Sequence, residues 1–181
     1  MKLYKFSPIK NKKELIEAIK HTHFECYKLC KQSFGYYLPN AGNIGIFCHY
    51  EEEYEKLIKI RKEITESSEN FNQKYFKFYN PIVVPAKNDV PQTTYTYLYI
   101  RKPDPYRSQV GDVDFYLELD EYKKLKTTMQ AGKNIKGARL FDRKDLDMIE
   151  LYDPDVDTLG YVSTHKMSQM VRTKLSDATK L

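Results

Sequence analysis

Three stretches of the chain carry apolar side chains at the spacing of an amphipathic helix: residues 12–33, 51–64 and 120–130. The stripe of the first stretch consists of Ile16, Ile19, His23, Cys26 and Cys30. The second stretch begins with three glutamates, which favour a helix N-terminus because its free N–H groups carry partial positive charge. The pattern therefore predicts helices over these ranges, the first of them ending at Gly35.

Other segments alternate apolar and polar positions, or form short β-branched and aromatic runs, as strands do. The expected strands cover residues 44–50, 75–79, 82–84, 93–101, 112–118, 138–142 and 147–152. Within the 93–101 strand, alternation places Tyr95, Tyr97 and Tyr99 on one face. In the 112–118 strand the acidic residues share one face and the apolar residues share the other.

The order of these elements predicts two successive strand–helix–strand units of βαβ type, at residues 43–101 and 112–155. Residues 1–42 add an N-terminal helical element, and residues 163–181 add a C-terminal helix or frayed tail. The apolar positions of that tail are Met167, Met170, Val171 and Leu175. We therefore expect one α+β domain over residues 1–181, with a mixed or antiparallel curved sheet, covering helices and an N-terminal helix.

Composition agrees with a folded domain, since 41% of the 181 residues are apolar and 30% are charged. No apolar run has the roughly 20 residues of a membrane span, and the basic N-terminus lacks the apolar segment of a secretory signal. Three cysteines at no disulfide-framework spacing indicate reduced thiols. We therefore expect a cytoplasmic protein with no membrane partner.

The net charge of +5 is concentrated at the two ends of the chain. Residues 1–33 contain eight lysines and three glutamates, and residues 166–181 contain four basic residues and one aspartate. Such ends suit a lysine-rich solvated surface, which we favour, or contact with phosphate groups or nucleic acid. The chain also has 16 tyrosines, which serve equally in ligand grooves and on half-buried strands.

All three cysteines and three of the four histidines fall within residues 21–49. They are His21, His23, Cys26, Cys30, Cys48 and His49. Zinc takes four such ligands, but the helical stripe that holds several of them continues from Ile16 and Ile19 and reads as core-facing. Buried cysteine packs as a small apolar group, so we expect core residues here and assign no metal or other cofactor.

Two further sets of side chains could take part in binding or catalysis. Asp112 and Asp114 alternate with apolar residues, and we expect them on a solvent-exposed face of the sheet. Glu150 is the better candidate for acid–base chemistry, because its face also carries Met148 and Tyr152. The second set combines rings that could stack a ligand with cations that could pair a phosphate, and a tyrosine ladder packed under a helix explains its rings equally well. It consists of Tyr95, Tyr97, Tyr99, Arg101, Lys102, Tyr106 and Arg107.

Residues 140–155 contain Phe141-Asp142, a short polar link and Ile149-Glu150-Leu151. This arrangement resembles the closing strands of vicinal oxygen chelate proteins, the superfamily of glyoxalases, ring-cleaving dioxygenases and bleomycin-resistance proteins. The resemblance would cover residues 43–155 and implies that Glu150 matches the family's metal-binding glutamate. The first strands depart from the family pattern, because the second unit offers only aspartates and the first offers only His49. The resemblance therefore implies a metal-free ligand-binding protein or a divergent enzyme.

The leading hypothesis is a small-ligand-binding domain with its pocket in the concavity of the sheet. Glu150 would be catalytic, and the ligand-binding residues would be Tyr97, Tyr99, Arg101, Arg107 and Tyr116. A nucleic-acid or nucleotide-phosphate binder is the first alternative, using the basic ends and the arginines. A homodimeric interaction module, using the tyrosine stripe and the terminal helix, is the second.

Overall fold

The computed structural model describes residues 4–143 and 145–174. Its helices are α1 (Lys12–Phe34), α2 (Glu51–Ile64), α3 (Leu119–Gln130) and α4 (His165–Met170). Its strands are β1 (Asn40–Phe47), β2 (Phe76–Val84), β3 (Thr93–Arg101), β4 (Gly111–Leu117), β5 (Ala138–Arg143), β6 (Leu146–Leu151) and β7 (Leu159–Thr164). Among the described helices, none has the length and apolar character needed to cross a lipid bilayer.

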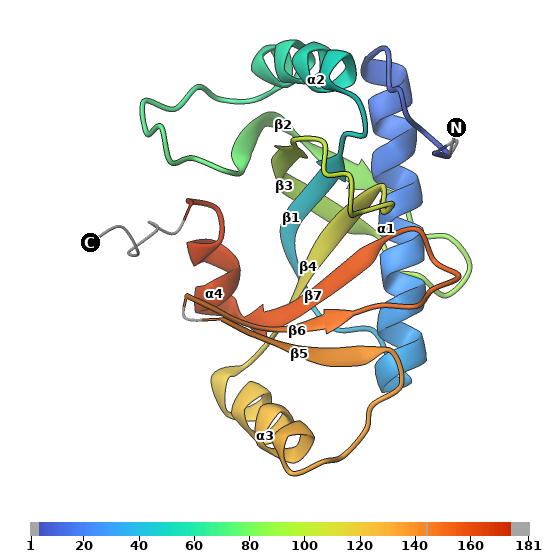
Figure 1. The fold of residues 1–181 in the computed structure, drawn as a ribbon, viewed down its shortest axis with the longest axis vertical. Coiled ribbons are helices and arrows are strands. Elements are labelled where there is room, and N and C mark those ends of the chain that lie inside the picture. The colour runs from blue at the N-terminus through green and yellow to red at the C-terminus, as the bar shows by residue number, and fades with distance from the viewer. Residues whose placement is uncertain (1–3, 144, 175–181) are drawn as a thin grey trace.

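The seven strands form one curved, open sheet in the order β2-β3-β1-β4-β7-β6-β5 (Figure 1). The pairs β1–β3 and β4–β7 are parallel, and the other neighbours are antiparallel. The two βαβ-type units therefore meet at the antiparallel β1–β4 pair in the middle of the sheet. This arrangement confirms the predicted α+β class with a mixed sheet, covering helices and an N-terminal helix.

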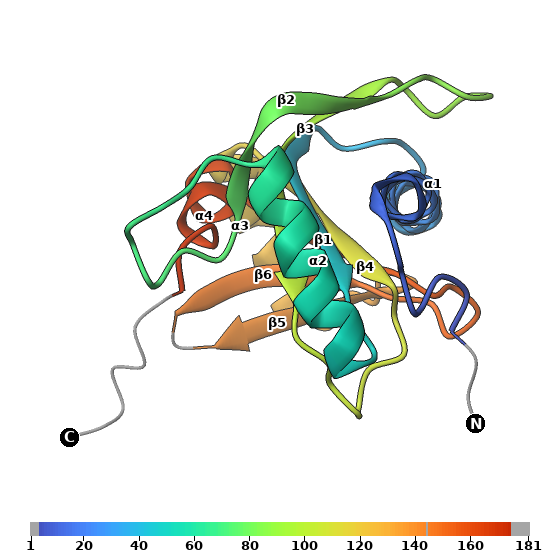
Figure 2. The same ribbon diagram turned by 90° about the horizontal axis from the view of Figure 1, so that it is seen from above.

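Helix α1 covers one face of the central strands, and α4 lies on the opposite side (Figure 2). The side chain of Asn11 caps α1 by accepting a hydrogen bond from the Glu14 N–H, and Gly35 ends the helix in the left-handed region. The residues that α1 buries against the sheet include Ile19, Cys26 and Cys30. The predicted helical stripe is therefore the core-facing one.

His23, Cys26 and Cys30 on α1 belong to this core, as expected. His21 is instead half-buried, and its Nε2 lies 2.7 Å from a carboxylate oxygen of Asp157. His23 is fully buried, and its Nδ1 shares a hydrogen bond of 2.8 Å with the hydroxyl of Tyr95. Cys26, Cys30 and Cys48 are buried free thiols, and burial raises the pKa of Cys30 to about 11. Thiols with a raised pKa are poor nucleophiles, so this cluster contributes packing.

Tyr95 differs from the predicted tyrosine face. The alternation placed it with Tyr97 and Tyr99, but it packs under α1 in the main core. Tyr97 and Tyr99 belong to a smaller cluster with Tyr75. The pairing of β2 with β3 changes register between Lys77 and Ile82, so strict alternation does not extend along the whole of β3.

The sequence pattern missed β7, which lies between β4 and β6 in the sheet. We predicted no strand over residues 159–164, where Gly160, Ser163 and Thr164 interrupt the apolar run. Helix α4 follows directly, within the range where we expected a C-terminal helix or a frayed tail, and Leu175 lies outside the described residues. The two predicted segments around Pro81 form one strand, β2, which tolerates proline because it is an edge strand.

Candidate ligand-binding cavity

A cavity of about 280 Å³ opens on the face of the sheet opposite α1. Its walls combine aliphatic side chains (Leu146, Met148 and Val171) with aromatic, cationic and acidic ones. The aromatic residues are Phe47, Tyr75, Tyr99, Phe141 and Tyr161, and the cationic residues are Lys74, Arg101, Arg107 and Arg143. Two carboxyl groups, those of Asp112 and Asp114, complete the polar lining. A small cavity with convergent polar groups is the usual setting of a ligand site.

The two aspartates are the deepest polar groups of this cavity. Asp112 is 6% exposed and Asp114 is 2% exposed, so the expectation of a solvent-exposed face was wrong. Their strand, β4, is central in the sheet, and α4 covers part of that face. The alternation was read correctly, but the face that it defined is closed over by neighbouring segments.

Gly45 on β1 makes room for Asp112. The two residues are paired across the β1–β4 ladder, and a methyl group at Gly45 would overlap Oδ1 of Asp112. This oxygen is buried and has no hydrogen-bond partner among the described residues. A buried carboxylate oxygen without a donor is costly unless a proton, a water molecule or a ligand satisfies it.

Asp114 is held differently. The Nδ2 group of Asn43 donates to Oδ2 of Asp114 over 2.8 Å and to the carbonyl of Ser168 over 2.7 Å. The Nε group of Arg172 donates to Oδ1 of Asn43 over 2.9 Å, which fixes the orientation of the amide. Asp114 Oδ2 is therefore a fixed acceptor, and a proton on Asp114 belongs on Oδ1.

Burial is the main cause of raised pKa values at both carboxyl groups. It raises the pKa of Asp112 to about 6 and that of Asp114 to about 7, where the charge of Asp112 adds to the shift. The positive charges of Lys74, Arg101 and Arg107 oppose the shift at Asp112. Near neutral pH the pair is therefore partly protonated, whereas ordinary aspartates would be fully ionised.

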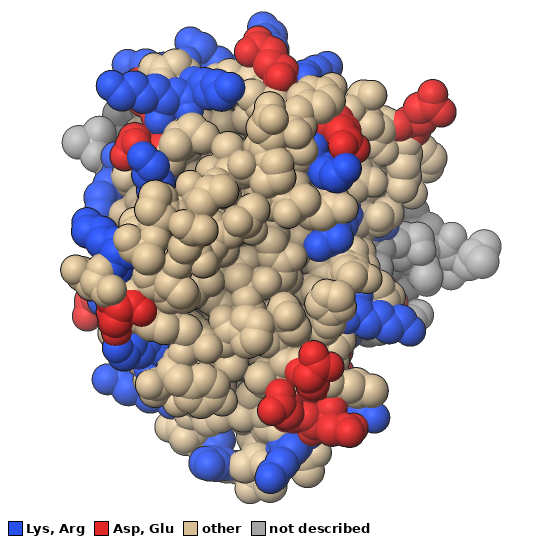
Figure 3. All heavy atoms as spheres, turned by 180° about the vertical axis from the view of Figure 1, so that it is seen from behind, with Lys and Arg blue, Asp and Glu red and all other residues tan. Residues whose placement is uncertain are grey.

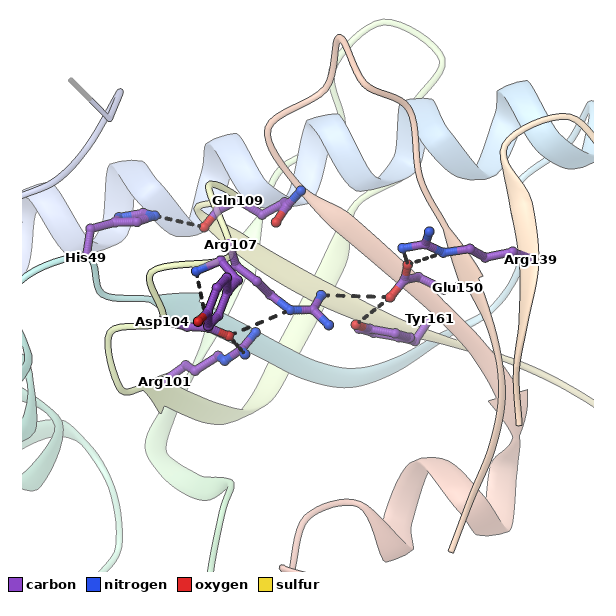
Figure 4. Close-up of polar contacts among 9 residues, drawn as sticks. His49, Arg101, Asp104, Arg107, Gln109, Arg139, Glu150 and Tyr161 are labelled. Atoms are coloured by element: carbon purple, nitrogen blue, oxygen red, sulfur yellow. Dashed lines mark hydrogen bonds and ion pairs between the residues drawn. The ribbon is translucent and has the colours of Figure 1, made fainter. Parts of the chain in front are cut away.

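Two arginines of the cavity, Arg101 and Arg107, contact carboxylates (Figure 4). Arg101 donates to Asp104 over 2.6 Å. The guanidinium of Arg107 lies between Asp104 and Glu150, 3.9 Å from an oxygen of each. The ammonium of Lys74 lies over the rings of Tyr75 and Tyr99, with centroid distances of 5.4 and 4.8 Å. These contacts hold three cations at one wall of the cavity.

Glu150 is fully buried on β6 but is not among the residues that line the cavity. Its Oε1 accepts hydrogen bonds from the guanidinium of Arg139, one of them 2.7 Å long, and its Oε2 accepts one of 3.1 Å from the Tyr161 hydroxyl. Both oxygens are therefore already used within the protein. The catalytic assignment of Glu150 stays a prediction.

The residues present do not fit the metal site that the resemblance implied. Glu150 is hydrogen-bonded to Arg139 and Tyr161, and Arg107 adds a further positive charge nearby. Across residues 4–143 and 145–174, no group of three or more His, Cys, Asp and Glu side chains is placed to hold a metal ion. A metal at this glutamate would have to displace two partners and lie beside a cation.

Three of the five predicted ligand-binding residues, Tyr99, Arg101 and Arg107, meet at the cavity. Tyr97 and Tyr116 lie outside its lining: the guanidinium of Arg172 stacks 3.8 Å over Tyr97, and the ring of Tyr116 meets His165. Sequence reasoning missed Lys74, Tyr75 and Tyr161 and assigned the aspartates to solvent. One feature of the sequence could have indicated that the aspartates are buried. They lie on one face of a short strand that is otherwise apolar and stands in the middle of the chain.

The arginines also bear on the nucleic-acid alternative. Arg101, Arg107 and Arg139 all contact carboxylates within the fold. On the face shown in Figure 3, lysines and arginines form separate groups, most of them near the margin, with acidic residues between them. No observation here favours a nucleic-acid partner or a homodimer, and both stay predictions.

No family model and no curated protein matches the chain. Among solved structures, a structural genomics structure of Protein EC4020 matches at 13% identity and a TM-score of 0.56, covering 94% of this chain and 98% of that one. This likeness shows that the two share a fold.

A variant of Streptomyces coelicolor methylmalonyl-CoA epimerase, in complex with 2-nitronate-propionyl-CoA, matches at 16% identity and a TM-score of 0.30. The match covers 70% of this chain and 98% of that one. A second methylmalonyl-CoA epimerase complex matches at 17% identity and a TM-score of 0.29. This epimerase is a vicinal oxygen chelate protein, but a similarity of this size carries no argument about the function of this chain.

Proposed function

We propose that the protein binds a small organic anion in the cavity opposite α1. The observation that carries this proposal is the charge of the lining, where four cationic side chains lie beside two carboxyl groups whose raised pKa values reduce their negative charge near neutral pH. Asp104 and Glu150 pair with Arg101 and Arg107. The remaining cations of the wall, Lys74 and Arg143, leave positive charge in excess. An anion entering the cavity would offset that excess in a partly desolvated site, where ion pairing is stronger than in water.

Two side chains are best placed to contact the anion. The ammonium of Lys74 lies over two tyrosine rings and forms no ion pair among the described residues. The guanidinium of Arg107 lies 3.9 Å from an oxygen of each of its two carboxylates, which is longer than a hydrogen bond. Its N–H groups can therefore make a shorter contact with a ligand. Arg101 already donates a hydrogen bond to Asp104, so we expect it to form part of the cavity wall without binding the anion directly.

The test is a titration with acetate and with inorganic phosphate at low ionic strength, followed by calorimetry and by backbone amide shifts. The wild-type protein should bind at least one of these anions, with shift changes at Asp112 and Tyr161. Arg107→Gln and Lys74→Gln should each weaken binding by about tenfold or more, because a hydrogen bond to a charged group contributes roughly 1.5–3 kcal/mol.

A matched control removes the same charge elsewhere. Lys133 is exposed on the turn after α3, so Lys133→Gln should leave the affinity unchanged. The proposal is contradicted if neither anion binds the wild-type protein, or if all three variants bind as the wild type does.

A further inference from the structure

The cavity has a negative pole as well as a positive one. Asp112 and Asp114 lie at its floor, and the rings of Tyr75, Tyr99 and Tyr161 line it beside them. The negative charge of Asp112 contributes to the raised pKa of each of these tyrosines, which shows that the rings and the carboxyl group are electrostatic neighbours. Carboxylates combined with aromatic rings form the surroundings that proteins use to bind organic cations.

A simple anion satisfies only one of the two poles. It would pair with Lys74 and Arg107 but would bring no donor to Oδ1 of Asp112, which is buried and has no hydrogen-bond partner among the described residues. Leaving such a group unpaired costs roughly 1–3 kcal/mol, and more if it is charged. A ligand that carries both an anionic group and a hydrogen-bond donor can pair with both poles at once.

We propose that the ligand is a small zwitterion of the amino-acid type, with its carboxylate on Arg107 and Lys74 and its ammonium against Asp112, Asp114 and the ring of Tyr161, since Lys74 already lies over the rings of Tyr75 and Tyr99. This inference rests on the proposed function, because it uses the same cationic wall for the anionic group. At about 280 Å³ the cavity lies just below the roughly 300–1,000 Å³ of common ligand pockets, so it suits a small ligand.

Two observations favour an ammonium over other groups at the negative pole. The protein itself already places an ammonium, that of Lys74, over Tyr75 and Tyr99. A divalent metal would need more ligands than the two carboxyl groups, and the described part of the chain brings no third His, Cys, Asp or Glu to them. A hydroxyl group could donate to Asp112, but it would gain little from the rings.

Binding of an ammonium group should change the protonation of Asp112 and Asp114. The negative pole is faced by titratable and charged groups from several elements: Tyr99, Arg101, Arg107, Tyr161, Lys74, Tyr75 and Arg172. A ligand ammonium brings a positive charge to Asp112 and Asp114 and so favours their ionised forms. Binding near neutral pH should therefore release a proton to the buffer, whereas binding of an anion alone should not.

The experiment uses matched probes on the wild-type protein: acetate, glycolate and glycine. They differ only in the substituent on the carbon next to the carboxylate. Propionate, 3-hydroxypropionate and β-alanine repeat the series with a longer spacing. In at least one series the amino acid should bind about tenfold more tightly than the unsubstituted acid. Calorimetry in buffers of different ionisation enthalpy should show net proton release for the amino acid only.

Two variants locate the effect. Asp112→Asn and Asp114→Asn, each checked for native amide shifts, should remove the preference for the amino acid and the proton release. Both variants should still bind acetate, because the cationic wall is intact. The Lys133→Gln control should keep the preference of the wild type.

The other outcomes separate this inference from the proposed function. If the amino and unsubstituted acids bind equally, or if the hydroxy acids bind best, the zwitterion inference is overturned while anion binding stands. If glycine and β-alanine bind without proton release, the assignment of the ammonium to the aspartates is overturned. If neither the acids nor phosphate bind, the proposed function fails as well.

Discussion

The two faces of β4 have opposite chemistry within one seven-residue strand. Val113 and Phe115 point under α1 into the main core, where the polar exceptions are buried groups such as His23. Asp112 and Asp114 point to the other side, into a cavity lined by cations and rings. Both faces are buried, so burial alone does not separate the structural residues from the candidate functional ones.

What differs between the faces is the setting of their buried polar groups. Under α1, Nδ1 of His23 meets the Tyr95 hydroxyl, and burial keeps the ring neutral by lowering its pKa to about 4. Nε2 of His23 and Oδ1 of Asp112 are both buried without a hydrogen-bond partner among the described residues. The histidine nitrogen lies in the packed core, whereas Asp112 lines a cavity that a ligand could enter.

The largest expected effect is a difference in stability between the two faces. Phe115 is fully buried, and its ring packs edge-on against Tyr27, so Phe115→Ala should lower the free energy of unfolding by about 3–5 kcal/mol. Asp114→Asn keeps the size of the side chain and should change the free energy of unfolding far less near neutral pH. Urea unfolding of both variants checks this, and equal losses would contradict the division between the faces.

The next effect concerns the space above Gly45. Gly45→Ala places a methyl group against Oδ1 of Asp112 and should cost about 1–3 kcal/mol of stability, as overpacked sites do. Asp112→Ala in the same chain should restore much of that loss, because it removes the group that the methyl meets. A double-mutant cycle measured by urea unfolding gives the interaction energy, and strictly additive effects would show that the two residues do not compete for space.

The two faces should also respond to pH with opposite signs. Burial lowers the pKa of His23 from 6.5 to about 4, so the unfolded chain takes up that proton more readily and stability falls as the pH drops through this range. Burial raises the pKa of Asp112 to about 6 and of Asp114 to about 7. The folded state holds those protons more tightly, so stability falls as the pH rises from about 4 to about 7.

A variant that removes the His23 contribution to the pH dependence of stability should show the contribution of the aspartates alone, and a variant at Asp114 should reduce the contribution of the aspartates. Across about pH 4 to pH 7, His23→Gln should make stability fall more steeply with rising pH, and Asp114→Asn should make it fall less steeply, each by on the order of 3 kcal/mol. Urea midpoints at several pH values give the slopes independently of any uniform loss of stability. Parallel slopes for the wild type and both variants would contradict the assigned pKa directions.

Much of the fold could be predicted from the sequence because long periodic segments have few alternative structures. The stripe on α1 and the alternation on β4 defined their faces correctly. Strand β7 was missed because six residues with a glycine, a serine and a threonine give little periodic signal. Tyr95 was misplaced because a change of register depends on the partner strand, which the local pattern does not contain.

The candidate site was predicted only in part. Tyr99, Arg101 and Arg107 are close in sequence, and the end of β3 with the following loop brings them together. Lys74, Tyr75 and Tyr161 come from distant parts of the chain. Residues 72–75 reach the cavity because they pair with the segment after α4, where the N–H groups of Lys74 and Tyr75 both donate to the carbonyl of Arg172.

The sequence by itself determined that Asp112 and Asp114 share a face and that Val113 and Phe115 share the opposite one, since side chains alternate along any strand. Only the tertiary structure decided that the acidic face is buried. That outcome depends on Gly45 leaving space on β1, on Asn43 holding Asp114, and on α4 with the segment after it closing the same side. These contacts join residues far apart in the chain, so no local pattern of polar and apolar positions could have shown that the carboxyl groups would be removed from water.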